Sequence, residues 1–318
     1  MKVLSLFDGI SGGRVALERA GIPVETYYAS EIDKYAMSVA QAMYPDTIQI
    51  GDVCKIDFTQ YIGKVDMIIG GSPCQDLSVA KQKREGLRGE RSKLFWRFVD
   101  ALDTIRPTWF LLENVASMRD EDRDAITETL RNIYPDVQCI MINSALLSAQ
   151  QRKRYYWTNW KVEQPEDKGV LLKDVLESDI ANRPKSRAIL ASIGRTTERE
   201  FFVKHQGQMV FKPIRLGGIA GLGKGQANRI YSVHGKSVCL NANGGGSGAK
   251  TGLYKVDLPD GDYTIRKLTP RECARLQTYP ERCFDVANIS NAQWYKAFGN
   301  GWTVDVIAHI FKQIPTEN

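Results

Sequence analysis

Val65-Asp66-Met67-Ile68-Ile69-Gly70-Gly71-Ser72-Pro73-Cys74-Gln75 is the stretch that decides the fold of this chain. Its first five residues, apolar apart from Asp66, are typical of a buried parallel strand. Cys74 follows that strand at its carboxyl end, where open α/β sheets place their chemistry. A cysteine there can equally be a buried, unreactive thiol. The choice between these interpretations depends on the residues before and after Cys74.

Strand and helix patterns alternate over the first 160 residues, which predicts a parallel sheet with crossover helices. From about residue 181 the pattern gives way to short extended pieces with many glycines and prolines. The expected strands are 2–7, 26–29, 65–69 and 109–112, and the expected helices run to about residue 20 and over about 34–43, 269–279 and 302–314.

The composition is that of a soluble globular protein, with 43% hydrophobic and 25% charged residues in 318. No apolar run has membrane-spanning length, and Asp8 interrupts the start too early for a signal peptide. The six cysteines form no Cys-x-x-Cys pair, which argues against a zinc site or a disulfide framework and favours a reducing, cytoplasmic location. The three histidines are isolated, so we expect no metal and no catalytic histidine.

The positive charge is concentrated in residues 181–264. This segment holds 13 Lys/Arg, 5 Asp/Glu and 14 of the 27 glycines, whereas the whole chain has a net charge of only +6. A basic, glycine-rich segment beside a near-neutral body suggests a module that binds a polyanion. The alternative is a solvated surface domain that happens to be basic.

A glycine-rich turn, Phe7-Asp8-Gly9-Ile10-Ser11-Gly12-Gly13, links the first strand to the first helix. Glycines let a ligand approach the backbone, and the helix offers free amides. Glu31, after the second strand, could hold ribose hydroxyls, and Asp52 could accept a hydrogen bond from an adenine amino group. Each acid alone could be a helix cap. Together they favour a cofactor that contains a nucleoside.

Two further motifs carry charged groups. Glu113-Asn114-Val115 follows the apolar residues 109–112, and a poorly solvated carboxylate there is suited to donate a proton. Gln150-Gln151-Arg152-Lys153-Arg154 enters an aromatic stretch, and two guanidiniums on one strand face can clamp a carboxylate or a phosphate. A helix cap and plain surface charges are the alternatives.

The order and spacing of these motifs resemble the DNA (cytosine-5)-methyltransferases, of bacterial or phage type by length. The resemblance includes Arg266–Gln277 and Phe298-Gly299-Asn300-Gly301, and it covers nearly the whole chain except most of the basic segment. The first motifs also look like the catalytic domain of the animal de novo enzymes. One departure is Ser11, where the family usually has glycine; a small residue there should still permit the turn.

The resemblance implies a Rossmann-like sheet that binds S-adenosylmethionine, and a flipped-out cytosine in double-stranded DNA as substrate. Cys74 would be the nucleophile, Glu113 the acid, and Arg152 and Arg154 would orient the base, Glu113 or a phosphate. The implied cofactor-binding residues are Phe7, Asp8, Gly9, Ile10, Ser11, Gly12, Glu31, Ile32, Asp52, Val53, Pro73, Leu94, Asn300 and Trp302.

Residues 76–93 would form a mobile loop that closes over the base, and the basic segment would be the target-recognition domain. The implied DNA-binding residues are Ser78, Lys81, Arg91, Gln226 and Arg229; Gln and Arg can read base edges. The predicted domains are 1–180 (catalytic and cofactor-binding), 181–264 (target recognition), 265–291 (a hinge) and 292–318 (a C-terminal helix returning to the first domain). We expect a monomer, with a cognate restriction endonuclease as a possible partner.

Three other functions compete with this interpretation. An RNA cytosine methyltransferase of the same family would carry a Cys-Phe-Thr signature in its recognition domain, whereas Cys283-Phe284-Asp285 lies after residues 266–277. A catalytically silent DNA-binding relative would have lost one of Cys74, Glu113 and Arg152. A dinucleotide oxidoreductase shares the fold but does not explain Pro73-Cys74 or Glu113-Asn114.

Overall fold

A computed structural model describes residues 1–72, 93–177, 215–218, 229–232, 235–237, 239–240, 253–257, 263–266 and 268–315 of the chain. The chain divides into two compact units. The first comprises Met1–Ile142, Lys153–Pro165 and Val306–Asn318, and the second comprises Asn143–Arg152 and Glu166–Asp305. The predicted domain bounds stay predictions, because most of residues 178–262 lie outside the described part.

The first unit is built on a seven-stranded sheet in the order β3-β2-β1-β4-β5-β7-β6. The β1, β2, β3, β4 and β5 strands are parallel to one another, whereas β7 runs antiparallel to β5. This confirms the predicted Rossmann-like α/β sheet. The strands are β1 (Lys2–Leu6), β2 (Thr26–Ser30), β3 (Ile48–Gln49), β4 (Met67–Gly71), β5 (Trp109–Val115), β6 (Gln138–Asn143) and β7 (Lys153–Thr158).

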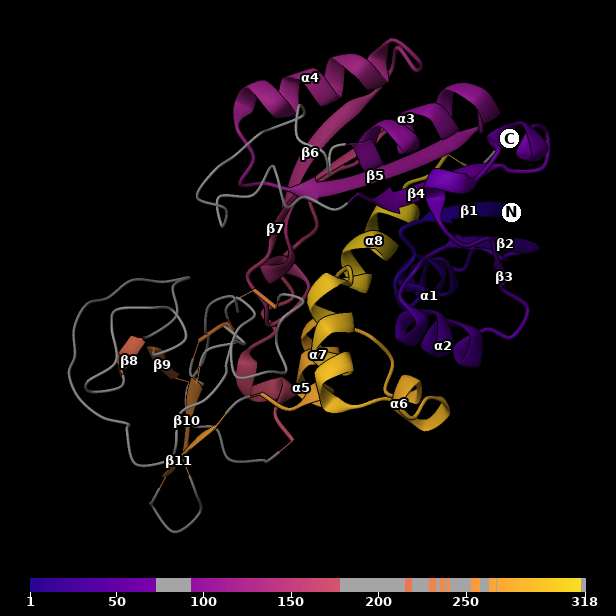
Figure 1. Cartoon of the computed structure of the whole chain (residues 1–318). Coiled ribbons are helices and arrows are strands. Elements are labelled where there is room, and N and C mark those ends of the chain that lie inside the picture. The colour runs from indigo at the N-terminus through magenta and orange to yellow at the C-terminus, as the bar shows by residue number, and fades with distance from the viewer. Residues whose placement is uncertain are drawn as a thin grey trace. The chain divides into compact units, whose positions relative to one another are not determined.

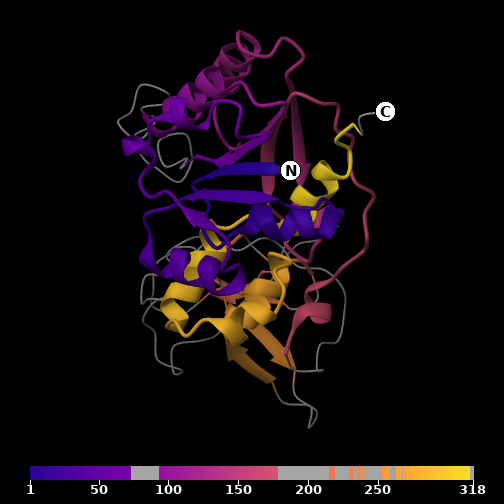
Figure 2. The same ribbon diagram turned by 90° about the vertical axis from the view of Figure 1, so that its right-hand side faces the viewer.

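Helices cover both faces of this sheet: α3 and α4 lie on one face, and α1 and α2 lie on the other (Figures 1 and 2). The helices are α1 (Gly12–Ala20), α2 (Lys34–Met43), α3 (Lys93–Ile105) and α4 (Asp120–Arg131). Short 3-10 helices, η1 (Val53–Lys55) and η2 (Phe58–Tyr61), connect β3 to β4. The main core packs apolar residues of α3 and α4 against strand residues such as Leu4, Ile68 and Phe110.

Gly70 lets α3 approach the sheet closely at the end of β4. A Cβ atom at this position would lie 2.9 Å from the carbonyl oxygen of Leu6 and 3.0 Å from the ring of Phe98. Both distances are too short for a side chain. The close packing of β1, β4 and α3 therefore requires a glycine three positions before Pro73.

The second unit contains a four-stranded sheet and several short helices. The strand order is β11-β10-β9-β8, with β9 and β10 parallel and the other pairs antiparallel. The strands are β8 (Arg215–Gly218), β9 (Arg229–Ser232), β10 (Leu253–Asp257) and β11 (Tyr263–Arg266); the helices are η5 (Ser144–Leu146), η6 (Leu172–Val175), α5 (Pro270–Leu276), α6 (Arg282–Val286) and α7 (Asn291–Asn300). The last helix, α8 (Val304–Phe311), begins in the second unit and ends in the first.

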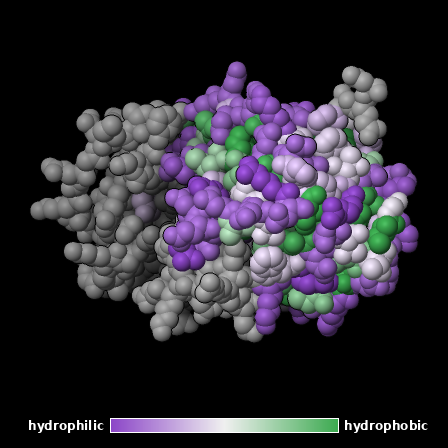
Figure 3. All heavy atoms as spheres, turned by 90° about the horizontal axis from the view of Figure 1, so that it is seen from above, coloured by the Kyte–Doolittle hydropathy of each residue, from purple (hydrophilic) through white to green (hydrophobic). Residues whose placement is uncertain are grey.

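Exposed apolar side chains are few and separated along the described chain. Ile32, Ile62 and Trp96 are the most exposed of the large ones. Figure 3 shows a face on which hydrophilic side chains predominate and hydrophobic ones form separated spots. Among the described helices, none combines the length and the apolar character needed to span a membrane.

Candidate active site

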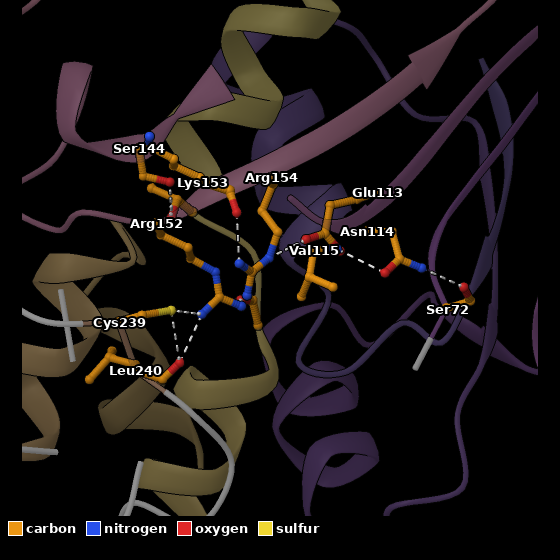
Figure 4. A network of polar contacts seen from close by, with 12 residues as sticks. Ser72, Glu113, Asn114, Val115, Ser144, Arg152, Lys153, Arg154, Cys239 and Leu240 are labelled. Carbon is orange, nitrogen blue, oxygen red and sulfur yellow. Dashed lines mark hydrogen bonds and ion pairs between the residues drawn. The ribbon is translucent and has the colours of Figure 1, made fainter. Parts of the chain in front are cut away.

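The end of β4 is joined to the Glu113-Asn114-Val115 motif, which forms the last residues of β5 rather than following the strand. Gly71 is the register partner of Glu113 in the parallel pairing of β4 and β5. One residue beyond each of these, the buried Asn114 side-chain amide donates a hydrogen bond of 3.2 Å to the Ser72 hydroxyl. Asn114 Oδ1 accepts a hydrogen bond of 2.8 Å from the Val115 amide. The sheet therefore anchors the last described residue before Pro73 and Cys74 beside Glu113 (Figure 4).

Glu113 forms an ion pair with Arg154, whose Nε lies 2.7 Å from Glu113 Oε1. Glu113 is opposite Tyr156 in the antiparallel pairing of β5 and β7, so Arg154 is its diagonal neighbour on the same face. The two side chains are only 11% and 15% exposed, which removes most of the solvent from around the pair. The arrangement fixes the orientation of the Glu113 carboxylate, and the Arg154 guanidinium balances its negative charge.

The turn after β1 has three residues in the left-handed region: Phe7 (φ 61°), Gly9 (φ 60°) and Ser11 (φ 56°). Glycine adopts this conformation without strain, whereas Phe7 and Ser11 need support from their surroundings. The buried Ser11 hydroxyl donates a hydrogen bond of 2.7 Å to Asp8 Oδ2. This bond explains how serine is accommodated where the family usually has glycine.

The Asp8 carboxylate points into the protein. Its Oδ1 accepts a hydrogen bond of 2.8 Å from the Tyr27 hydroxyl, and Oδ2 accepts the bond from Ser11. Burial raises the pKa of the Asp8 carboxyl, against the opposing effect of hydrogen bonds from Ser11, Ser5 and Tyr27. The Asp8 side chain therefore stabilises the turn from within the protein. A ligand bound at this position would contact the main-chain atoms of Asp8 rather than its carboxylate.

Glu31 connects the same turn to the end of β2. Glu31 Oε2 accepts a hydrogen bond of 2.9 Å from the Gly9 amide, and Oε1 accepts bonds of 2.7 and 2.8 Å from the amides of Ile32 and Asp33. The Ile32 side chain is 75% exposed, although it is apolar. A carboxylate next to an exposed apolar side chain suits a ligand with hydroxyls and a flat ring.

Asp52 lies after β3, at the same edge of the sheet. It caps η1 by accepting a hydrogen bond of 3.0 Å from the Cys54 amide, and the Ser30 hydroxyl bonds to the carbonyl of Gly51 at 2.7 Å. The buried Val53 belongs to the core, and Leu94 of α3 packs against that core. The structure thus gathers the predicted residues 7–12, 31–32 and 52–53 around the carboxyl ends of β1, β2 and β3.

Arg97 of α3 holds the Asp52–Val53 turn in place, and no motif in the sequence points to this role. Its Nε donates a hydrogen bond of 3.0 Å to the carbonyl of Val53, and Nη2 donates one of 2.6 Å to that of Ile56. The guanidinium also lies 4.5 Å from the centre of the Phe58 ring. Arginine contacts to main-chain carbonyls leave no pattern in a sequence, so the sequence does not predict this role of Arg97.

In the second unit, Arg152 is 5% exposed, and every contact described for it is within that unit. Its guanidinium donates to the carbonyls of Leu240 (2.9 Å) and Gly301 (3.0 Å) (Figure 4). Asn300 is exposed at the end of α7, and Trp302 is partly buried. The remaining predicted residues, Pro73, Cys74, Ser78, Lys81, Arg91 and Gln226, lie outside the described residues; for Arg229, on β9, the structure describes the main chain alone.

Three other cysteines, Cys139, Cys273 and Cys283, differ from what a nucleophile needs. Burial raises the pKa of the Cys139 thiol to about 11 and that of Cys283 to about 12, and it raises the pKa of Cys273 well above its ordinary value. Thiols with such pKa values are poor nucleophiles at neutral pH. In the described ranges, no group of three or more His, Cys, Asp or Glu side chains is placed to hold a metal ion.

Comparison with known proteins agrees with this geometry. The chain is 30% identical to the type II methyltransferase M.HhaI of Haemophilus parahaemolyticus, over 98% of this chain and 93% of the relative. It is 25% identical to the orphan methyltransferase M.SPRI of Bacillus phage SPR, over 99% and 97% of the two chains. A putative DNA modification methyltransferase encoded within an Escherichia coli prophage has the same fold, with a TM-score of 0.64 at 19% identity and coverage of 99% and 98%.

The solved structure of the S. pombe Dnmt2 methyltransferase also shares the fold, with a TM-score of 0.63 at 18% identity over 97% of this chain and 96% of that one. The sequence model of the C-5 cytosine-specific DNA methylases matches residues 1–316. The resemblance seen in the sequence is therefore confirmed, and the chain belongs to the family of C-5 cytosine-specific DNA methylases.

Proposed function

We propose that this DNA (cytosine-5)-methyltransferase uses Cys74 as its nucleophile and Glu113 as its acid, and that Arg154 orients Glu113. The observation that carries the proposal is the buried ion pair between Arg154 and Glu113, at 2.7 Å. Glu113 is in register with Gly71, and Cys74 follows Gly71 by three residues. The sheet register thus supports a short separation between the nucleophile's strand end and the acid.

The chemistry follows from the nature of cytosine. Carbon 5 is a poor nucleophile, and addition of the Cys74 thiolate to carbon 6 makes it electron-rich. Glu113 bonds to ring nitrogen 3 and the exocyclic amine, and it donates the proton that accompanies the addition. Once carbon 5 carries the methyl group, its proton is lost and the bond between sulfur and carbon 6 breaks. Nitrogen 3 returns its proton to Glu113, which restores the aromatic ring and frees Cys74 as the thiolate.

The cofactor of this family is S-adenosylmethionine, which supplies an electrophilic methyl group when it is bound. The turn over Phe7–Gly12 is partly exposed at Phe7 and Gly9 and has its Asp8 side chain turned inward, which fits the approach of such a ligand to its main chain. Glu31 has carboxylate oxygens suited to ribose hydroxyls, and the exposed Ile32 side chain suits the face of an adenine ring. Asp52, Val53 and Leu94, together with Pro73, Asn300 and Trp302, complete the proposed set.

The substrate is a cytosine in duplex DNA, which has to leave the base stack to reach Cys74. We assign phosphate contacts to Ser78, Lys81 and Arg91, and base contacts to Gln226 and Arg229. Residues 181–264, with 13 Lys/Arg against 5 Asp/Glu, supply the positive charge for this interface. We further propose a cytoplasmic monomer that acts alone or beside a restriction endonuclease.

The test is expression of the protein in a methylation-free host, followed by bisulfite sequencing of the host DNA. We expect 5-methylcytosine at one short sequence with the wild type and none with Cys74→Ala. Glu113→Gln should lower kcat by about 100- to 1000-fold, the usual contribution of a general acid. Identical maps without 5-methylcytosine for the wild type and Cys74→Ala would refute the proposal.

A further inference from the structure

Arg152 joins two segments of the second unit that are far apart in sequence. Nη1 donates to the carbonyl of Leu240 at 2.9 Å and lies 3.2 Å from Cys239 Sγ. Nη2 donates to the carbonyl of Gly301 at 3.0 Å, and both nitrogens lie 3.4 Å from the carbonyl of Gly299. The side chain is buried, and these acceptors face both terminal nitrogens of its fork.

Gln150, two residues earlier, makes the same connection. Its Oε1 accepts a hydrogen bond of 3.0 Å from the Leu240 amide. Its Nε2 donates to Gln277 Oε1 at 3.0 Å, and Gln277 Nε2 donates to the carbonyls of Phe298 (2.6 Å) and Gly301 (3.1 Å). Leu240 is thus held through both its amide and its carbonyl, and residues 298–301 are held by Gln277 and Arg152 together.

The segment on the Leu240 side is fixed along its described length. We call Lys236, Ser237, Cys239 and Leu240 the linker segment. The buried Lys236 ammonium donates to the carbonyls of Ala145 and Ser148, and the Ser237 amide donates to the carbonyl of Ala149 at 3.0 Å. The linker segment follows β9, which carries Arg229.

We propose that Arg152 is a positioning residue that couples DNA recognition to cofactor binding. The inference rests on the proposed function, in which β9 belongs to the DNA-reading domain and Asn300 contacts the cofactor. These hydrogen bonds tie the linker segment, Arg152 and residues 299–301 into one body, so a displacement of that body on DNA binding also displaces Asn300, which lies between Gly299 and Gly301. Because coupling between two sites is reciprocal, each ligand changes the affinity for the other by the same factor.

This role differs from direct orientation of the cytosine. A guanidinium that bonds to main-chain carbonyls of two segments has its donors engaged before DNA arrives. Lysine cannot replace it, because a single ammonium group lacks the planar, forked set of donors with which the guanidinium bonds to both segments at once. Arg152→Lys should therefore loosen the connection between the segments while it keeps the positive charge.

The experiment measures the affinity of S-adenosylhomocysteine for the full chain by calorimetry, with and without a duplex that carries the methylated sequence found by bisulfite mapping. The variants are Arg152→Lys and, as a matched control in the same unit, Arg271→Lys, whose guanidinium contacts Glu281 and Phe284 at the surface. We expect the duplex to increase the affinity of the wild type and of Arg271→Lys to the same degree. In Arg152→Lys this increase should fall at least about fivefold.

A second measurement needs no variant. In the wild type, S-adenosylhomocysteine alone should slow hydrogen exchange at the amides of Ser237 and Leu240. Unchanged exchange there would overturn the inference, even if Arg152→Lys failed to fold. So would an Arg152→Lys enzyme whose kcat falls while the effect of the duplex on affinity is unchanged, since that result identifies a residue that orients the base. A wild type that binds no S-adenosylhomocysteine would refute the proposed function, and this inference with it.

Discussion

Arg154 and Glu113 form a diagonal pair across the antiparallel ladder of β5 and β7, with 2.7 Å between Nε and Oε1. The two strands hold the pair rigidly and largely out of water. Removal of one partner leaves the other charge poorly solvated, which is costly in a protein interior.

This geometry predicts a strong coupling in a double-mutant cycle. Arg154→Gln and Glu113→Gln should each lower the free energy of unfolding by about 3–5 kcal/mol. The double variant should lose at least about 1 kcal/mol less than the sum of the single losses. Urea denaturation of the four proteins measures these values, and additive losses would show that the pair contributes nothing as a pair.

Gly70→Ala should destabilise the protein by about 1–3 kcal/mol, the range for overpacked cores. The added methyl group would lie 2.9 Å from the carbonyl oxygen of Leu6 and 3.0 Å from Phe98. Thermal melting checks the loss. Gly63→Ala is the contrasting variant: it has φ 70° with open space around the position, so backbone strain alone penalises it. Phe98→Leu should relieve part of the loss in Gly70→Ala and none in Gly63→Ala.

Asp8 should make stability depend on pH. Because its pKa is raised in the folded protein, mainly by burial, folding favours the protonated form. The unfolding free energy of the wild type should therefore fall relative to that of Asp8→Asn as pH rises from the ordinary value of 3.8 toward the folded pKa. Denaturation at pH 4.5 and 7.5 measures the difference.

Asp57→Asn is the matched control for Asp8, because it should differ from the wild type by nearly the same amount at both pH values. Hydrogen bonds from Thr59 lower the pKa of Asp57 from 3.8, so its contribution is lost only as pH falls below that value. If Asp8→Asn followed the wild type at both pH values, the buried carboxyl would not be the titrating group.

Cys139 should resist alkylation at pH 8. Burial raises the pKa of its thiol from 9.0 to about 11, which reduces the thiolate fraction by about 100-fold. Peptide mass spectrometry after brief iodoacetamide treatment should therefore find Cys139 and Cys283 unmodified while the exposed Cys54 is labelled. Equal labelling of all three would contradict the burial that the fold assigns to them.

Arg97→Ala should weaken cofactor binding and leave the chemistry almost unchanged. Arg97 acts through the carbonyls of Val53 and Ile56, so its loss should raise KM for S-adenosylmethionine about tenfold, the effect of losing about 1.5 kcal/mol of hydrogen bonding. The control is Arg106→Ala, which removes an exposed arginine just after α3 and should alter neither constant. A fall in kcat at unchanged KM would exclude this positioning role.

The sequence predicted strands β1, β2, β4 and β5 because each contains a short apolar run that ends in a polar or glycine-rich stretch; it did not predict β3, which has only two residues. It also predicted which motifs lie at the carboxyl ends of these four strands, since the carboxyl ends of parallel strands meet at one edge. The sequence also singles out Glu113, because a carboxylate that directly follows the apolar residues Leu111 and Leu112 needs a partner for its charge.

Contacts made through main-chain atoms could not be predicted. Gln150 and Arg152 stood out as a motif, yet their acceptors are carbonyls and amides near residues 240, 277 and 301, and any residue type supplies those groups. The inward direction of Asp8 depends on Tyr27, nineteen residues away, and no periodicity links the two. The left-handed conformation of Ser11 is equally invisible, because its support is the Asp8 side chain rather than a glycine.

The reversal of strand direction at β7 has a consequence for how this chain can change in length. Arg154 lies near the start of β7 and Glu113 near the end of β5, and these two ends are paired in the antiparallel ladder. The pairing therefore sets the distance between the two side chains, and the length of the chain between Val115 and Lys153 does not. That stretch makes an excursion through α4 and β6 and can gain or lose residues in its connections without moving the acid or its partner. Insertions between Val115 and Lys153 should therefore leave the position of the Glu113 carboxylate relative to Arg154 unchanged.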